Sequence, residues 1–166
     1  MLQNEKSQLY GQIFIYILTV VLISFIVVYG YNAIQNLRDR ADKISCYKFK
    51  NDLRNAVQSI LSDFGSVKRK DLQLCPGYNQ VCFVETFNEF DTQNLKSNAP
   101  IDPIIRHSIA SNVGRNVFLV DNMAKESFYI GNISVNDDIL CVSASDNRIS
   151  LRLEGKGNNV LLGGWS

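Results

Sequence analysis

Four cysteines are the residues of this chain best suited to covalent chemistry, and all of them follow one long apolar run near its start. They are Cys46, Cys75, Cys82 and Cys141. An even number of cysteines on one side of a membrane segment is typical of two disulfides in a domain outside the cytoplasm. A zinc site is disfavoured because the sequence has no CxxC pair and a single histidine.

The pairing of the cysteines depends on where the strands run. Cys82 and Cys141 each lie inside a short apolar strand pattern, so a bridge between neighbouring strands is favoured, which leaves Cys46 for Cys75. If residues 76–79 form a hairpin turn, Cys75 and Cys82 become diagonal neighbours about 7 Å apart. A disulfide needs Cβ atoms about 3.8 Å apart. A wider loop would bring that pair back into range, so all three connectivities stay open at this point.

A catalytic pattern is missing from the sequence. His107 is the only histidine, and no acid or base partner for it can be identified. Asp137 with Asp138, and Glu85 with Glu89, lack the pattern of a calcium loop. The glycine-rich stretch 153–158 lacks the GxxxxGK[ST] frame of a phosphate loop and predicts a β-turn. We therefore expect no catalytic, cofactor-binding or metal-binding residue and no enzyme.

The element that positions all of these residues is an apolar N-terminal segment. Between Gln12 and Ile34 the sequence has no charged residue, and about 20 apolar residues suffice for a helix to cross a bilayer. Tyrosines lie near both ends, as in the aromatic belts of membrane helices: Tyr10, Tyr16, Tyr29 and Tyr31. A buried core helix would be shorter and would show a polar stripe. Residues 12–34 therefore predict a transmembrane helix.

After the membrane segment the pattern becomes amphipathic over residues 35–64. Apolar residues recur at spacings of three and four, which is one face of a helix: Leu37, Ala41, Ile44, Leu53, Val57, Ile60, Leu61 and Phe64. Gly65 is a natural C-cap. Because no proline interrupts residues 12–65, one helix of about fifty residues is expected, which would be roughly 75 Å long at the standard rise per residue. A break in this helix near Cys46 is left open.

Strand patterns fill most of the remaining chain, and strands so close in sequence are expected to pair antiparallel. They cover residues 66–74, 80–85, 116–121, 127–133, 138–143 and 148–154. A capping Asp102 followed by Pro103 predicts a short helix over 102–110, and residues 89–100 predict an exposed loop. Trp165 is expected either to pack the tail onto the domain, with anchoring in the core as the default, or to contact a neighbouring chain.

The fold class is therefore α+β, a long N-terminal helix followed by a small antiparallel β domain with one short helix. The expected divisions are a leader (1–11), a transmembrane helix (12–34), an amphipathic continuation (35–64) and the β domain (65–166). A formal net charge of +1 argues against nucleic acid as a partner. The one dense basic cluster, residues 68–70, is interpreted as a solvated strand face.

The sequence carries conflicting signals for the orientation of the protein in the membrane. The basic residues after the segment outnumber Lys6 before it, which by the positive-inside rule favours a cytoplasmic domain. The short leader with a lysine, the even cysteine count and a sequon at 132–134, whose acceptor is Asn132, favour export. We expect a single-pass protein with its C-terminal domain outside the cytoplasm.

The N-terminal region resembles archaeal type IV pilin-like proteins. The features that carry the resemblance are the polar leader with Lys6, the junction between Gly11 and Gln12, and the apolar helix that becomes amphipathic before a β domain. The recognisable motif covers about the first fifth of the chain. A vaguer similarity to small archaeal membrane proteins of the same plan extends to residues 65–67, 81–84 and 153–157. The resemblance implies cleavage after Gly11 by a prepilin-peptidase-like enzyme, and packing of the mature helix with copies or other pilin-like subunits in a filament.

The chain departs from the pilin pattern at two places. Many pilins have an acidic residue five positions into the mature chain, where this sequence has Tyr16, and a lysine or arginine before the glycine, where it has Leu9 and Tyr10. A minor pilin, or a pilin-like protein that does not polymerise, fits these departures better than a major subunit.

Two classes of function follow from the sequence. In the first, the chain is a structural subunit of a type IV filament or its assembly system, and small residues allow close helix packing: Thr19, Ser24, Gly30 and Ala33. These residues could instead be merely tolerated in lipid. In the second, it is a non-polymerising anchored ectodomain that binds a partner protein or a surface glycan through residues 87–100. The two differ in whether the chain is cleaved and found in cell-surface fibres.

Overall fold

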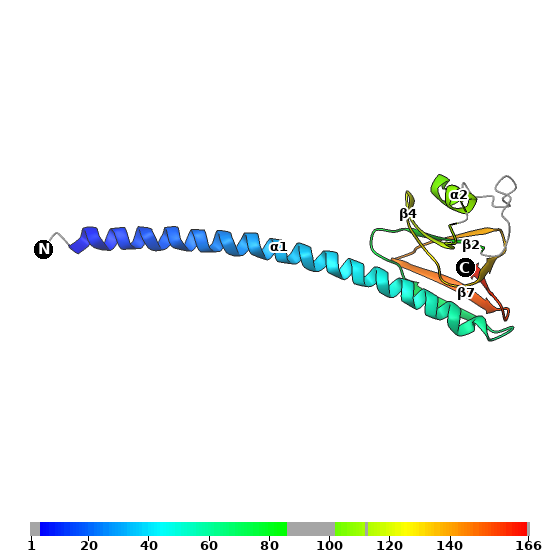
Figure 1. Ribbon diagram of the computed structural model, residues 1–166. Helices are drawn as coiled ribbons and strands as arrows, with labels where there is room; N and C mark the ends of the chain where they lie inside the picture. Colours follow the sequence, from blue (N-terminus) through cyan, green and yellow to red (C-terminus); the bar gives the residue numbers. More distant parts are fainter. Residues whose placement is uncertain (1–3, 86–101, 112, 166) are drawn as a thin grey trace. The chain divides into compact units, whose positions relative to one another are not determined.

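The computed structural model describes residues 4–85, 102–111 and 113–165, with side chains from Ile13 onward. Figure 1 shows the elements in chain order. They are α1 (Asn4–Leu61), β1 (Val67–Gln73), β2 (Gln80–Val84), α2 (Pro103–Ala110), β3 (Val117–Asp121), β4 (Met123–Phe128), β5 (Ile133–Val135), β6 (Ile139–Ser143), β7 (Arg148–Gly155) and β8 (Val160–Gly164). The chain divides into two units, Met1–Lys43 and Ile44–Ser166, and α1 contributes to both. The predicted α+β class is confirmed.

The strands of the second unit form two four-stranded sheets. One has the order β1-β7-β8-β5 and the other the order β4-β3-β2-β6. All pairs are antiparallel except β5 with β8, which run parallel from the pairing of Ile133 with Val160. The expectation of uniformly antiparallel pairing therefore fails at one edge of the first sheet.

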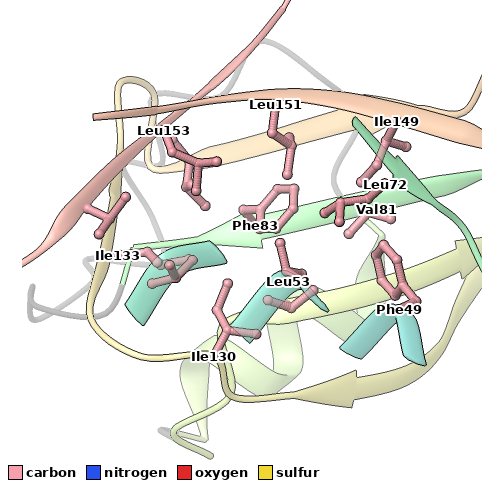
Figure 2. Packing of buried hydrophobic residues seen from close by; sticks show 14 of the residues in the cluster. Phe49, Leu53, Leu72, Val81, Phe83, Ile130, Ile133, Ile149, Leu151 and Leu153 are labelled. Carbon is pink, nitrogen blue, oxygen red and sulfur yellow. The ribbon is translucent and has the colours of Figure 1, made fainter. Parts of the chain in front are cut away.

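The main core lies where the last turns of α1 meet both sheets. Phe49, Leu53, Val57 and Ile60 of α1 are buried in it. Figure 2 shows Phe49 and Leu53 with buried side chains of both sheets, among them Phe83 of β2 and Leu151 of β7. Apolar residues of α1 that are three and four apart, from Phe49 to Ile60, therefore point into one core, whereas other apolar residues of the predicted amphipathic segment lie outside it.

A second, smaller core explains why the strands β2 and β3 are apolar on both faces. Val81 and Phe83 belong to the main core, whereas Cys82 and Val84 lie on the opposite face of the sheet, where Ile105 of α2 is buried. Successive side chains of a strand alternate between its faces. A strand covered on both faces therefore becomes a continuous apolar run.

Helix α2 confirms the predicted short helix and its cap. One carboxylate oxygen of Asp102 accepts from the backbone N–H of Ile104 at 2.7 Å, and the other accepts from the N–H of Ala124 in β4 at 2.6 Å. Asp102 thereby accepts a hydrogen bond from a first-turn N–H that has no partner within the helix. Its second oxygen links α2 to the sheet that this helix covers.

Three strand predictions differ from the structure. The predicted strand 127–133 is wrong over most of its length: residues 127–128 end β4, whose residues 123–126 were not predicted, and Ile133 begins β5. Residues 129–132 are not in a strand, because Gly131 has φ +121° and the buried side-chain amide of Asn116 bonds to the main chain there. Its Nδ2 donates to the Gly131 carbonyl at 2.7 Å, and its Oδ1 accepts from the Ile130 N–H at 3.1 Å. Strand β8 was not predicted. Strands β1 and β2 belong to different sheets, so residues 76–79 are not the turn of a paired hairpin.

Candidate functional site

The apolar segment is the largest surface feature of the first unit. Every residue from 13 to 34 is exposed, and its large apolar side chains keep between 44% and 71% of their surface open. Among the described residues, one helix is long and apolar enough to cross a membrane, and it lies near the N-terminus. A soluble protein would normally cover such a surface, so the segment suits a lipid or helical environment.

The four small residues of this segment differ in what they can offer a second helix, and Ala33 among them presents only an exposed methyl group. The Thr19 hydroxyl donates to the Tyr16 carbonyl at 2.8 Å, and the Ser24 hydroxyl donates to the Val20 carbonyl at 2.8 Å. Both groups are satisfied within α1 and need no partner from another chain. A Cβ at Gly30 would meet nothing within 4 Å, so close approach by another helix is open there.

The junction between Gly11 and Gln12 lies within the backbone of α1, which begins at Asn4. The helix therefore starts inside the expected leader. The side chain of Gln12 lies outside the described part of the structure.

Apolar residues of the predicted amphipathic segment are not all covered. Leu37 in the first unit, and Ile44 and Tyr47 in the second, are exposed, in contrast with Leu53 and Val57. The final predicted residue, Phe64, is also exposed and lies beyond the end of α1 at Leu61. Phe49 is buried although the spacing argument omitted it.

The cysteines pair as Cys46 with Cys75 and Cys82 with Cys141, the connectivity that strand placement favoured. Cys82 and Cys141 are direct cross-strand partners in the β2–β6 ladder, with Cα atoms 4.0 Å apart. The other bridge links α1 to the residues after β1 across 29 positions of sequence. Both disulfides lie within the second unit.

The residues considered for catalysis do not assemble into a site. His107 Nδ1 lies 3.3 Å from the Ser111 hydroxyl on the same helix. Burial, followed by the nearby charge of Asp138, raises the pKa of the Glu85 carboxyl, whereas Glu89 lies outside the described residues. Within the described ranges, no three histidine, cysteine or acidic side chains are grouped to hold a metal ion.

Polar contacts fix α1 against β4. Lys50 pairs with Glu126, and its ammonium lies 5.4 Å from the centre of the Phe128 ring. Burial is the main cause that raises the pKa of the nearby Tyr78 hydroxyl, and the charge of Glu126 adds to it. These contacts hold the part of α1 that belongs to the second unit against β4.

The outer face of β1 and β7 carries a second polar cluster. The Ser150 hydroxyl donates to Asp71 at 2.6 Å, and Arg69 donates to the same carboxylate oxygen at 3.0 Å. The Ser150 bond, followed by the Arg69 bond, holds the pKa of Asp71 below its ordinary value. The Arg69 guanidinium lies 5.5 Å from the centre of the Trp165 ring, which is 43% exposed. Trp165 therefore packs on the surface, and the expectation that it anchors in the core is wrong.

The sequon lies at the start of β5. Asn132 is partly buried, and its Oδ1 accepts a hydrogen bond from the Tyr129 hydroxyl at 2.8 Å. Its backbone carbonyl accepts from the N–H of Val160. The loop proposed for partner binding, residues 87–100, lies outside the described residues.

An open cleft that sequence reasoning did not find lies beside the sequon. It has a volume of about 510 Å³ and is lined by Arg54, Gln58, Val113, Gly114, Arg115, Phe128, Tyr129, Ile130 and Gly131. All of these residues belong to the second unit. The two arginines come from distant parts of the sequence, and no local spacing pattern could have brought them together.

Comparison with known proteins gives no further identification: no protein-family model, no curated protein and no solved structure matches this chain.

Proposed function

We propose that this chain is a membrane-anchored, pilin-like structural subunit of a type IV filament or of its assembly system. The observation that carries the proposal is the division of α1, whose apolar segment is fully exposed whereas its last turns form the core of a β domain. Such a helix leaves the whole apolar segment available to lipid or to helices of other subunits. The β domain is then the outward face.

Placement of the β domain outside the cytoplasm is part of this proposal. Its support is the pair of disulfides formed by all four cysteines, because disulfides persist in oxidising compartments and are rare in the cytosol. Alkylation of intact cells tests it directly. Four free thiols in the native protein would contradict an external domain.

Mass spectrometry of the amino terminus of the natively expressed protein tests processing. We expect Gln12 as the first residue, and recovery of the cleaved chain with extracellular fibres. The variant Gly11→Leu should retain the leader and remain in the membrane fraction, whereas the leader variant Ser7→Ala should be processed normally. An intact Met1 in the wild-type protein, together with its absence from fibres, would overturn the proposal and favour a non-polymerising anchored ectodomain.

A further inference from the structure

The open cleft beside the sequon combines positive charge with apolar walls. Arg54 projects from α1, and Arg115 precedes β3. One N–H of Arg54 donates to the Tyr129 carbonyl at 3.1 Å, and one N–H of Arg115 donates to the Ser127 carbonyl. A guanidinium has five N–H donors. Each arginine is thus held in place by one bond and keeps donors for a ligand.

The charges of the two arginines are not balanced by acidic residues of the cleft. Among the residues that the structure describes, no aspartate or glutamate lines it. Within residues 4–85, 102–111 and 113–165, the ion pairs involve other side chains. Two guanidinium groups that share a concave surface without a carboxylate create a local positive potential, so the ligand that suits this cleft is an anion.

The other residues that line the cleft indicate what else its anionic ligand must contain. Val113 and Tyr129 are exposed apolar or aromatic side chains at its rim, and Ile130 is buried beneath it. The Tyr129 ring is 43% exposed, and its hydroxyl is fixed by Asn132. The Gln58 amide supplies both a donor and an acceptor. A small inorganic ion would leave these apolar walls unused.

We propose that this cleft binds a carboxylate-bearing sugar of an acidic polysaccharide. The planar guanidinium groups match a carboxylate geometrically, the C–H face of a sugar ring can pack on Tyr129, and its hydroxyls can bond to Gln58. The volume of the cleft, about 510 Å³, falls within the range of roughly 300–1,000 Å³ typical of small-ligand sites. This proposal concerns the second unit alone and does not depend on whether the chain polymerises.

Calorimetric titration of the full chain in detergent micelles tests the proposal, with trigalacturonic acid as the probe. We expect saturable binding that weakens as sodium chloride is raised, because salt screens exposed charges. The methyl ester of the same trisaccharide, which is neutral and keeps the rings, should bind about tenfold more weakly or not at all, since the charge-assisted bonds are lost. Equal binding of the acid and the ester would overturn the assignment.

Variants locate the binding to the cleft. Arg115→Gln should weaken trigalacturonate about tenfold or more through loss of charge-assisted bonds, whereas Arg106→Gln on α2 makes the same chemical change outside the cleft and should have no effect. Gln58→Glu keeps both arginines and their backbone bonds but adds a negative charge at an exposed position, so it should abolish binding without altering thermal unfolding. Equal loss in Arg106→Gln, or unchanged binding in Gln58→Glu, would contradict the proposal.

A carboxylate can also be offered by a peptide, and a second titration separates the two sources. An acetylated tripeptide with a free C-terminal carboxylate should bind at least about tenfold more weakly than trigalacturonate, because it lacks the rigid ring face and the hydroxyls. Tighter binding of the peptide would overturn the saccharide assignment in favour of a peptide ligand.

Discussion

At Gly155 the backbone of β7 lies close to the C-terminal end of α1 and the residues that follow it. Its N–H donates to the Ser66 carbonyl at 3.0 Å, and its carbonyl accepts from the N–H of Gly65 at 2.8 Å. A Cβ at this position would collide with the backbone carbonyl oxygens of Ile60 and Asp63. Within the glycine-rich stretch 153–158, Gly155 therefore serves close backbone packing.

The substitution Gly155→Ala should lower the free energy of unfolding by about 1–3 kcal/mol, the usual cost of overpacking. The colliding atoms belong to the backbone, so they cannot move aside by a rotamer change. Urea unfolding followed by Trp165 fluorescence measures the effect. Gly164→Ala is the matched control, because a Cβ there meets nothing within 4 Å. Equal stability of the two variants would contradict the contact with α1.

Asp71 predicts a dependence of stability on acid pH. Its bonds from Ser150 and Arg69 hold its pKa below the ordinary value of 3.8. A carboxyl whose pKa is lower in the folded state stabilises that state above its unfolded pKa and loses the effect as pH falls through the folded pKa. The difference in unfolding free energy between wild type and Asp71→Asn should therefore be present at pH 6 and shrink as the pH falls below 3.8.

A titration by nuclear magnetic resonance assigns the cause. Because the Ser150 hydroxyl makes the leading contribution, Ser150→Ala should move the pKa of Asp71 upward, toward its ordinary value. An unchanged titration of Asp71 in that variant would show that the 2.6 Å bond from Ser150 does not control the charge of this carboxyl.

At the scale of elements, the two disulfides join different pairs of secondary-structure elements. Cys46 and Cys75 join a helix to the end of a strand, whereas Cys82 and Cys141 join adjacent strands. Replacing the first pair with alanine should cost about 3–4 kcal/mol in the chain-entropy description of a closed loop. Urea unfolding of the full chain in detergent measures this cost, and an unchanged midpoint would contradict it.

The second pair gives an internal comparison. Its cysteines are separated by 59 positions, against 29 for the first pair. Doubling a loop adds roughly 0.6 kcal/mol to its closure cost, so replacing Cys82 and Cys141 with alanine should destabilise the domain slightly more. The reverse order would indicate that local packing, and not loop closure, determines the contribution of each bridge.

The sequence predicts elements best where the physical signal is local. The cap at Asp102 and the apolar period of α1 depend on residues close in sequence, and both helices were predicted. Strand β8 (Val160–Gly164) was missed because it contains two glycines, which are depleted in strands. Residues 127–133 match one strand pattern, but the hydrogen bonds from Asn116 that interrupt it come from a residue distant in sequence.

The candidate sites were likewise predictable only where they depend on residues close together in the sequence or on strand placement. The apolar segment and the cysteine pairs could be predicted because composition and strand placement suffice for them. The cleft could not, because Arg54 and Arg115 become neighbours only once α1 packs against the sheets. Neither arginine lies in a run of basic residues. Neither has neighbours in the sequence at a spacing that would distinguish it from an ordinary solvated surface residue.

At the scale of the whole molecule, the proposed role as a filament subunit requires an exposed apolar helix in a chain that is also stable on its own. Gly30 allows these two requirements to be tested separately. A Cβ at this position meets nothing within 4 Å, and leucine favours a helix over glycine by up to about 1 kcal/mol. Gly30→Leu should therefore preserve the monomer, while its added bulk keeps a second helix from approaching closely.

We expect Gly30→Leu to reduce recovery in the extracellular fibre fraction about tenfold, which corresponds to about 1.4 kcal/mol of lost association, with an undiminished amount in the membrane. Val28→Leu adds bulk at a position that is already large and should assemble normally. Ser24→Ala should also assemble, because the Ser24 hydroxyl is satisfied by the Val20 carbonyl of its own helix. Fibres of Gly30→Leu at wild-type yield would mean that the helices do not meet at Gly30 and that this glycine is merely tolerated in lipid.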